Sequence, residues 1–60
     1  MREFEVYKDK DYKLILRANS KYTLEEFEDG KWYASVTGPY RYMLIVLGDK
    51  GLSRIISAIT

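Results

Sequence analysis

The sequence contains no cysteine and no histidine, and these two absences exclude much of the chemistry that small domains use. Without cysteine there is no disulfide and no thiolate metal site, and without histidine the commonest metal ligand and the usual general base are missing. Catalysis would then depend on Lys, Tyr, Asp or Glu beside a Ser or Thr, and no spacing in the chain marks such a pair. We therefore expect a non-enzymatic protein with no cofactor and no metal site.

Long apolar segments are also lacking. The longest apolar run, residues 42–47, is far shorter than the roughly 20 residues that a membrane-spanning helix needs. The N-terminus alternates charged and apolar residues in place of the apolar core of a signal peptide. We therefore expect no membrane association and a cytoplasmic location.

The chain has little excess charge of either sign. Ten Lys and Arg residues oppose nine Asp and Glu residues, which gives a net charge of +1. No strong field then draws the protein toward phosphate polymers, so nucleic-acid binding is disfavoured. Acidic side chains gather at residues 25–29 and could hold a hard cation or act as paired carboxylates, but a solvated face is the interpretation we favour.

The composition nevertheless predicts a folded chain. Of the 60 residues, 47% are hydrophobic and 32% are charged, which is typical of a globular protein and fits one domain over residues 1–60. A domain of this size buries only about 60% of the surface that its unfolded chain exposes. Because disulfides and metals are excluded, self-association is the remaining source of added stability, and we expect a homo-oligomer.

Alternation of polar and apolar residues predicts two strands near the N-terminus, at residues 3–7 and 12–17. The polar residues 8–11 between them predict a turn, so these strands form an antiparallel hairpin. Aromatic and β-branched residues predict another strand at residues 31–36. A turn at residues 37–39 ends it, because Gly38 and Pro39 meet there.

Residues 23–28 fit two structures. In the first, Thr23 is the N-cap of a short helical turn and Glu26 is its reciprocal capping partner. In the second, residues 22–24 form a strand paired with residues 32–36, and Asp29 with Gly30 belongs to a type I′ hairpin turn. We favour the short helical turn.

If residues 40–47 form a strand, apolar side chains lie on both of its faces, which favours a strand that is covered on both faces. A helix that begins at Pro39 is the alternative, but β-branched and aromatic residues argue for the strand. Residues 48–51 then break the chain. There we interpret Asp49 as a helix cap and Gly51 as a turn residue, in preference to an anion site at a helix N-terminus.

The last segment predicts an amphipathic helix. Apolar residues recur at the helical spacing i, i+3, i+4 and i+7, at Leu52, Ile55, Ile56 and Ile59. A helix this short is not stable alone in water, so its apolar side must pack on the sheet. The second face of the sheet would still lack a cover, and a partner chain could supply it.

These elements predict the α+β class, with a small antiparallel sheet of about four strands and the C-terminal amphipathic helix on one face. Residues 29–36 resemble the turn and strand of SH3-like small barrels of the Tudor type. The resemblance covers that segment only. It implies the alternative fold, an SH3-like small β-barrel, with peptide or nucleic-acid recognition by the aromatic strands.

Aromatic residues are the most prominent feature of the chain, with six Tyr, two Phe and one Trp. Several of them flank the turn at residues 37–39 and, with one arginine, form our candidate interaction surface: Trp32, Tyr33, Tyr40, Arg41 and Tyr42. Tyr, Trp and Arg are enriched at binding hot spots, but cross-strand packing explains aromatic residues in strands equally well. Within the set, Trp32 fits a core position best.

From these residues we predict a small protein-interaction module, a regulator or inhibitor that binds a larger protein through a tyrosine-rich face, binds itself, or does both. The alternative is a small nucleic-acid-binding β domain, in which bases stack on aromatic rings and scattered Lys and Arg residues contact the backbone.

Overall fold

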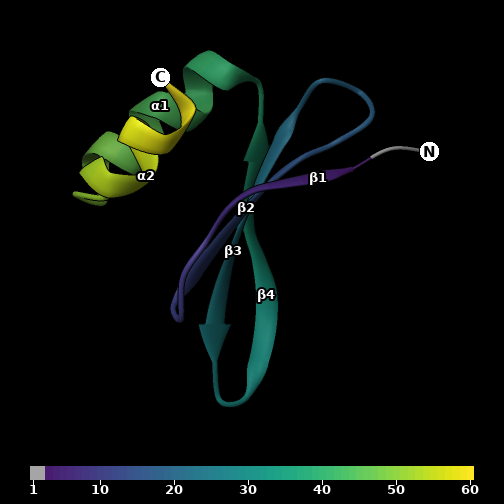
Figure 1. Ribbon diagram of the computed structural model, residues 1–60, viewed down its shortest axis with the longest axis vertical. Coiled ribbons are helices and arrows are strands. Elements are labelled where there is room, and N and C mark those ends of the chain that lie inside the picture. Colours follow the sequence, from purple (N-terminus) through teal and green to yellow (C-terminus); the bar gives the residue numbers. More distant parts are fainter. Residues whose placement is uncertain (1–2) are drawn as a thin grey trace.

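The computed structural model describes residues 3–60 as an antiparallel sheet followed by two helices (Figure 1). In chain order the elements are β1 (Phe4–Lys8), β2 (Tyr12–Leu16), β3 (Tyr22–Glu28), β4 (Lys31–Gly38), α1 (Tyr40–Asp49) and α2 (Ser53–Ile59). The strands lie in the order β1-β2-β3-β4, so each pairs with its neighbour in sequence. The predicted α+β class is confirmed. The sheet is open, which agrees with the main prediction and not with the barrel alternative.

The predicted N-terminal hairpin is present, and its turn is built as the sequence indicates. The Asp9 carboxylate accepts hydrogen bonds from the backbone N–H groups of Asp11 at 2.8 Å and Tyr12 at 2.7 Å. These are the local side-chain bonds by which aspartate favours turns. They bring β1 and β2 into antiparallel pairing, with Lys8 opposite Lys13 at the turn end.

The preferred helical turn at residues 23–28 is wrong, because the segment belongs to strand β3. Asp29 and Gly30 both have positive φ angles, 53° and 77°, which is what a two-residue type I′ hairpin requires. That turn sets Glu28 opposite Lys31. On the other side of the strand, Leu24 pairs with Leu14. Pairing on both sides therefore overrides the local helix-capping signal.

The predicted strand at residues 40–47 is also wrong, because these residues form helix α1. A strand covered on both faces needs a packed layer on each side, and a chain of 60 residues cannot supply both. In the helix, Met43 and Leu47 lie one turn apart and are buried on the same side. Pro39 occupies the N-cap, where its missing N–H costs no hydrogen bond.

Helix α1 ends in a Schellman motif, which corrects the role assigned to Asp49. The N–H of Leu52 donates to the carbonyl of Leu47 at 2.9 Å, and the N–H of Gly51 donates to the carbonyl of Gly48 at 3.0 Å. Gly51 has a φ of +72°, the left-handed conformation that this motif requires. Asp49 is thus the last residue of α1, and Leu52 is the N-cap of α2.

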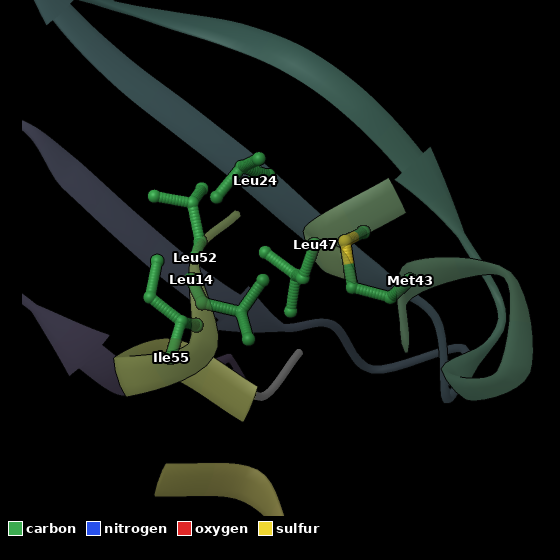
Figure 2. Packing of buried hydrophobic residues seen from close by; sticks show 6 residues of the cluster. All are labelled: Leu14, Leu24, Met43, Leu47, Leu52 and Ile55. Carbon is green, nitrogen blue, oxygen red and sulfur yellow. The ribbon is translucent and has the colours of Figure 1, made fainter. Parts of the chain in front are cut away.

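The hydrophobic core lies between one face of the sheet and the two helices (Figure 2). It consists of six buried side chains, one pair each from the sheet, from α1, and from α2 with its N-cap: Leu14 and Leu24, Met43 and Leu47, and Leu52 and Ile55. Alternation along the strands directs their intervening residues, such as Ile15 and Thr23, to the other face. In residues 3–60 no helix covers that face. Among the described residues the longest helix has ten residues, and none is long and apolar enough to cross a membrane.

Candidate interaction surface on helix α1

The structure divides the predicted aromatic surface between the two ends of β4. Trp32 lies near the β3–β4 turn, which extends away from the helices (Figure 1). There its ring is 5.1 Å from that of Phe27, and the ammonium group of Lys13 lies 4.5 Å from its centre. Tyr33, the next residue on the strand, is exposed on the opposite face of the sheet. Tyr40 begins α1 at the other end of β4, roughly 20 Å further along the strand.

Tyr40 lies near the surface and also contacts residues of the sheet and of helix α2. Its ring is 5.8 Å from that of Tyr22 on β3, at an angle of 49°. Its hydroxyl donates a hydrogen bond of 3.1 Å to the carbonyl of Ile59 at the end of α2. Tyr40 therefore links the sheet to both helices, and its contacts within the domain account for its position.

Tyr42 is held in one orientation by Gly38. A Cβ atom added at Gly38 would lie 2.5 Å from Cδ2 of the Tyr42 ring, so the ring rests directly on the glycine backbone. Tyr42 nevertheless keeps 46% of its surface exposed. A fixed but exposed aromatic ring is suited to binding because little conformational entropy remains to be lost.

The contact between Gly38 and Tyr42 gives a stability prediction. We expect Gly38→Ala to lower the free energy of unfolding by about 1–3 kcal/mol, because the added methyl group overlaps the ring. Urea denaturation followed by circular dichroism measures this change. The same substitution in a Tyr42→Ala background should cost much less. Equal costs in the two backgrounds would contradict the proposed steric conflict.

The outer side of α1 contains the most exposed large apolar side chain of the described residues, Ile45, which is 62% exposed. Its neighbours one turn away on the same side are also exposed. Together they form the surface that we call the α1 outer face: Arg41, Tyr42, Ile45, Gly48 and Asp49. Sequence reasoning identified Arg41 and Tyr42 but missed the other three residues, because a strand at 40–47 hides their helical spacing.

The charges of the α1 outer face stand at the ends of the helix where they are unfavourable. Arg41 is in the first turn, near the positive end of the helix dipole, and Asp49 is in the last turn, near the negative end. The first turn has no acidic residue and the last turn has no basic residue. Within residues 3–60, neither Arg41 nor Asp49 takes part in an ion pair, since the four pairs present are Lys13–Glu25, Arg17–Glu3, Lys50–Glu26 and Arg54–Asp9.

Reversing the charge at position 41 should therefore stabilise the isolated domain. We expect Arg41→Glu to raise the free energy of unfolding by roughly 0.3–1 kcal/mol at low salt, because a carboxylate suits a helix N-terminus. Lys10→Glu, with the same change of charge in an exposed turn, is the matched control. Unfolding should be measured at low protein concentration. An unchanged or lower stability of Arg41→Glu relative to the control would contradict the helix-dipole argument.

A second polar cluster joins α2 to the first hairpin. The Arg54 guanidinium donates through Nε to Oδ2 of Asp9 at 2.9 Å and to the Tyr7 hydroxyl at 3.1 Å. The Tyr7 hydroxyl donates to the same carboxylate oxygen at 2.6 Å. This hydrogen bond is the largest cause of a lowered pKa at Asp9, and it raises the pKa of Tyr7. Because every contact is made within the domain, we interpret the cluster as a structural clamp.

The acidic segment does not assemble a set of carboxylates. On strand β3, Glu25 and Glu26 point to opposite faces of the sheet. Glu26 accepts a hydrogen bond of 2.9 Å from the Ser35 hydroxyl, which lowers its pKa, and forms an ion pair of 3.2 Å with Lys50. A shallow hollow of about 310 Å³ lies near it, lined partly by Asp11 and Glu28. The described residues contain no group of three side chains placed to hold a metal ion.

Comparison with known proteins gave no match to a family model, a curated protein or a solved structure.

Proposed function

We propose that the protein is a small non-enzymatic interaction module that binds protein surfaces through the α1 outer face. The exposure of Ile45 is the observation that carries this proposal. Scattered exposed apolar residues are common in proteins. Here, however, Ile45 stands one turn from the fixed ring of Tyr42 and the guanidinium of Arg41. Tyrosine and arginine around an apolar centre have the composition of a binding hot spot.

The shape of this surface suits a regulatory role. Its two exposed anchors, Tyr42 and Ile45, stand three residues apart on one helix, a spacing that fits an apolar groove or another helix. The domain is compact, with a radius of gyration of 10.7 Å. We propose that it acts by occupying a surface, as a regulator or inhibitor of a larger protein does.

Capture experiments with a matched control test this proposal. Tagged wild-type protein, Ile45→Glu and Phe4→Glu are used to retain proteins from the native cell extract. Phe4 is 53% exposed on β1, the edge strand farthest from β4. Phe4→Glu therefore also replaces an exposed apolar side chain with a carboxylate, but at a site away from α1. We expect proteins held by the wild type and by Phe4→Glu to be lost with Ile45→Glu. If Ile45→Glu retains the same proteins as the wild type, the proposal is wrong.

The open face of the sheet supports a second candidate, the binding of single-stranded nucleic acid. Phe27 is 44% exposed and packs against Trp32, so bases could stack there. Against this, Lys13 already covers the Trp32 ring and pairs with Glu25 at 3.8 Å.

Titration with a single-stranded oligonucleotide at several salt concentrations separates the two candidates. Nucleic-acid binding requires a log-log slope of about −0.7 for each neutralised phosphate, and it requires a loss of affinity in Trp32→Ala. We expect no binding at physiological salt. A steep slope together with dependence on Trp32 would replace the first candidate.

A further inference from the structure

The α1 outer face is complementary to itself. We infer that its partner is a second copy of this chain, whose α1 packs antiparallel across a two-fold axis that passes beside Ile45. This inference rests on the proposed function and names the partner of the same surface. The positions of its charges support this inference, an open glycine permits close approach of the two helices, and the size of the face sets the strength of the contact.

The charges complement each other under a two-fold axis. Arg41 stands four residues before Ile45 and Asp49 stands four residues after it. In an antiparallel pair centred on Ile45, Arg41 of one copy is level with Asp49 of the partner subunit. The symmetry repeats that contact at the other end, as in any two-fold interface. The two charges that are unfavourable in a single α1 are then compensated by the opposite charges of the second copy.

The small size of Gly48 allows the two helices to approach closely. Gly48 stands three residues after Ile45, on the flank of the α1 outer face opposite Tyr42. A Cβ atom at Gly48 would have no neighbouring atom within 4 Å, so this position is open. A glycine without a side chain next to the axis allows two helices to approach to about 8–10 Å. The two Ile45 side chains then meet at the centre and leave water.

The size of the face sets the strength of the contact. Helix α1 has ten residues and is therefore about 15 Å long. A standard interface buries about 800 Å² on each partner, which is roughly a fifth of the 4169 Å² of accessible surface here. One short helix buries less than that. We therefore expect a reversible dimer that forms at micromolar concentrations and dissociates on dilution.

Sedimentation equilibrium over a wide range of protein concentration tests the dimer. We expect the wild type and the control Phe4→Glu to share one dimerisation constant. Ile45→Glu should weaken it by at least about a hundredfold, because two apolar side chains are lost and two like charges meet at the axis. Ile45 is exposed in the single copy, so this variant should fold, and circular dichroism checks that it does.

Charge exchange tests the antiparallel register. Arg41→Glu and Asp49→Arg should each weaken dimerisation by about tenfold, because each homodimer then contains two like-charged pairs. Mixing the two variants should restore association, since the heterodimer has two attractive pairs. The mixed species is identified by tagging one variant with a larger fusion partner.

Three results would overturn the inference: a wild type that stays monomeric up to millimolar concentration, a dimer that persists in Ile45→Glu, or a mixture that associates no better than its components. A persistent dimer would point to an edge of the sheet, β1 or β4, as the interface. If the wild type is monomeric but captured proteins still depend on Ile45, a groove on another protein is the occupant. In that case the inference of a dimer fails and the proposed function stands. If the wild type is monomeric and no captured protein depends on Ile45, both the dimer and the proposed function are rejected.

Discussion

Replacing Leu24 with alanine is expected to lower the free energy of unfolding by about 2–5 kcal/mol. Leu24 is fully buried at the centre of the core, where it pairs with Leu14 on β2 and Val36 on β4. A chain of 60 residues has a total stability of roughly 3–9 kcal/mol. The loss is therefore comparable to the whole stability, and a large fraction of Leu24→Ala should be unfolded at 25 °C.

Urea denaturation, followed by the Trp32 fluorescence and by far-ultraviolet circular dichroism, measures this effect. Ile45→Ala is the matched control, because it removes a similar side chain from an exposed position. At low protein concentration its unfolding free energy should change by no more than about 0.5 kcal/mol. A Leu24→Ala variant that is as stable as Ile45→Ala would show that the core is placed wrongly.

Replacing Asp9 with asparagine is expected to lower the free energy of unfolding by about 1–3 kcal/mol at pH 7. The new side chain retains one carbonyl oxygen for the turn bonds to Asp11 and Tyr12. It presents an NH₂ group in place of the oxygen that accepts from Tyr7 and Arg54. Asp11→Asn, in the same turn, is the matched control and should change stability little.

The pH dependence of this effect follows from the pKa of Asp9. The hydrogen bond from Tyr7, the backbone N–H groups and Arg54 lower that pKa in the folded protein. The unfolded chain binds its proton near the ordinary value of about 3.9, so the contribution to stability is complete above that pH. It is lost as the pH falls through the lowered pKa of the folded state.

Stability curves of the wild type and Asp9→Asn should therefore converge on acidification. We expect a constant difference in unfolding free energy between pH 5 and pH 7, and a shrinking difference below about pH 4. Thermal unfolding at a series of pH values measures it. A difference that stays the same down to pH 2 would mean that the charge of Asp9 does not stabilise the clamp.

The parts of the fold that could be predicted from sequence are those where local signals and tertiary contacts agree. The first hairpin has alternating strands and an aspartate that builds its turn, so its local sequence determines its structure. The helix α2 has its apolar residues on one side, and Ile55 is buried as that spacing requires.

The wrongly predicted elements are those in which the local sequence favours one structure and the tertiary contacts favour another. Residues 23–28 carry a capping signal, but a strand there pairs on both sides, and Leu24 enters the core. Helix α1 is apolar around most of its circumference, so its period is hard to recognise. The excess apolar residue is Ile45, which faces outward. The feature that obscured the helix is thus the same feature that forms the candidate surface.

Only part of the α1 outer face could be predicted from the sequence. Arg41 and Tyr42 could be named because their residue types are typical of binding hot spots. Gly48 and Asp49 could not, because their relation to Ile45 appears only when residues 40–49 form a helix. Trp32 was grouped with them because it is close in sequence, although β4 holds it at the far end of the sheet.

Dimerisation through the α1 outer face is tested most directly by a dilution series followed by amide NMR chemical shifts, which report on each residue separately. We expect concentration-dependent shifts that are largest at Arg41, Tyr42, Ile45, Gly48 and Asp49. We also expect small changes at Trp32 and along the free edge of β4. Shifts centred on β4 or on the open face of the sheet would contradict the account, and so would a spectrum that does not change between micromolar and millimolar protein.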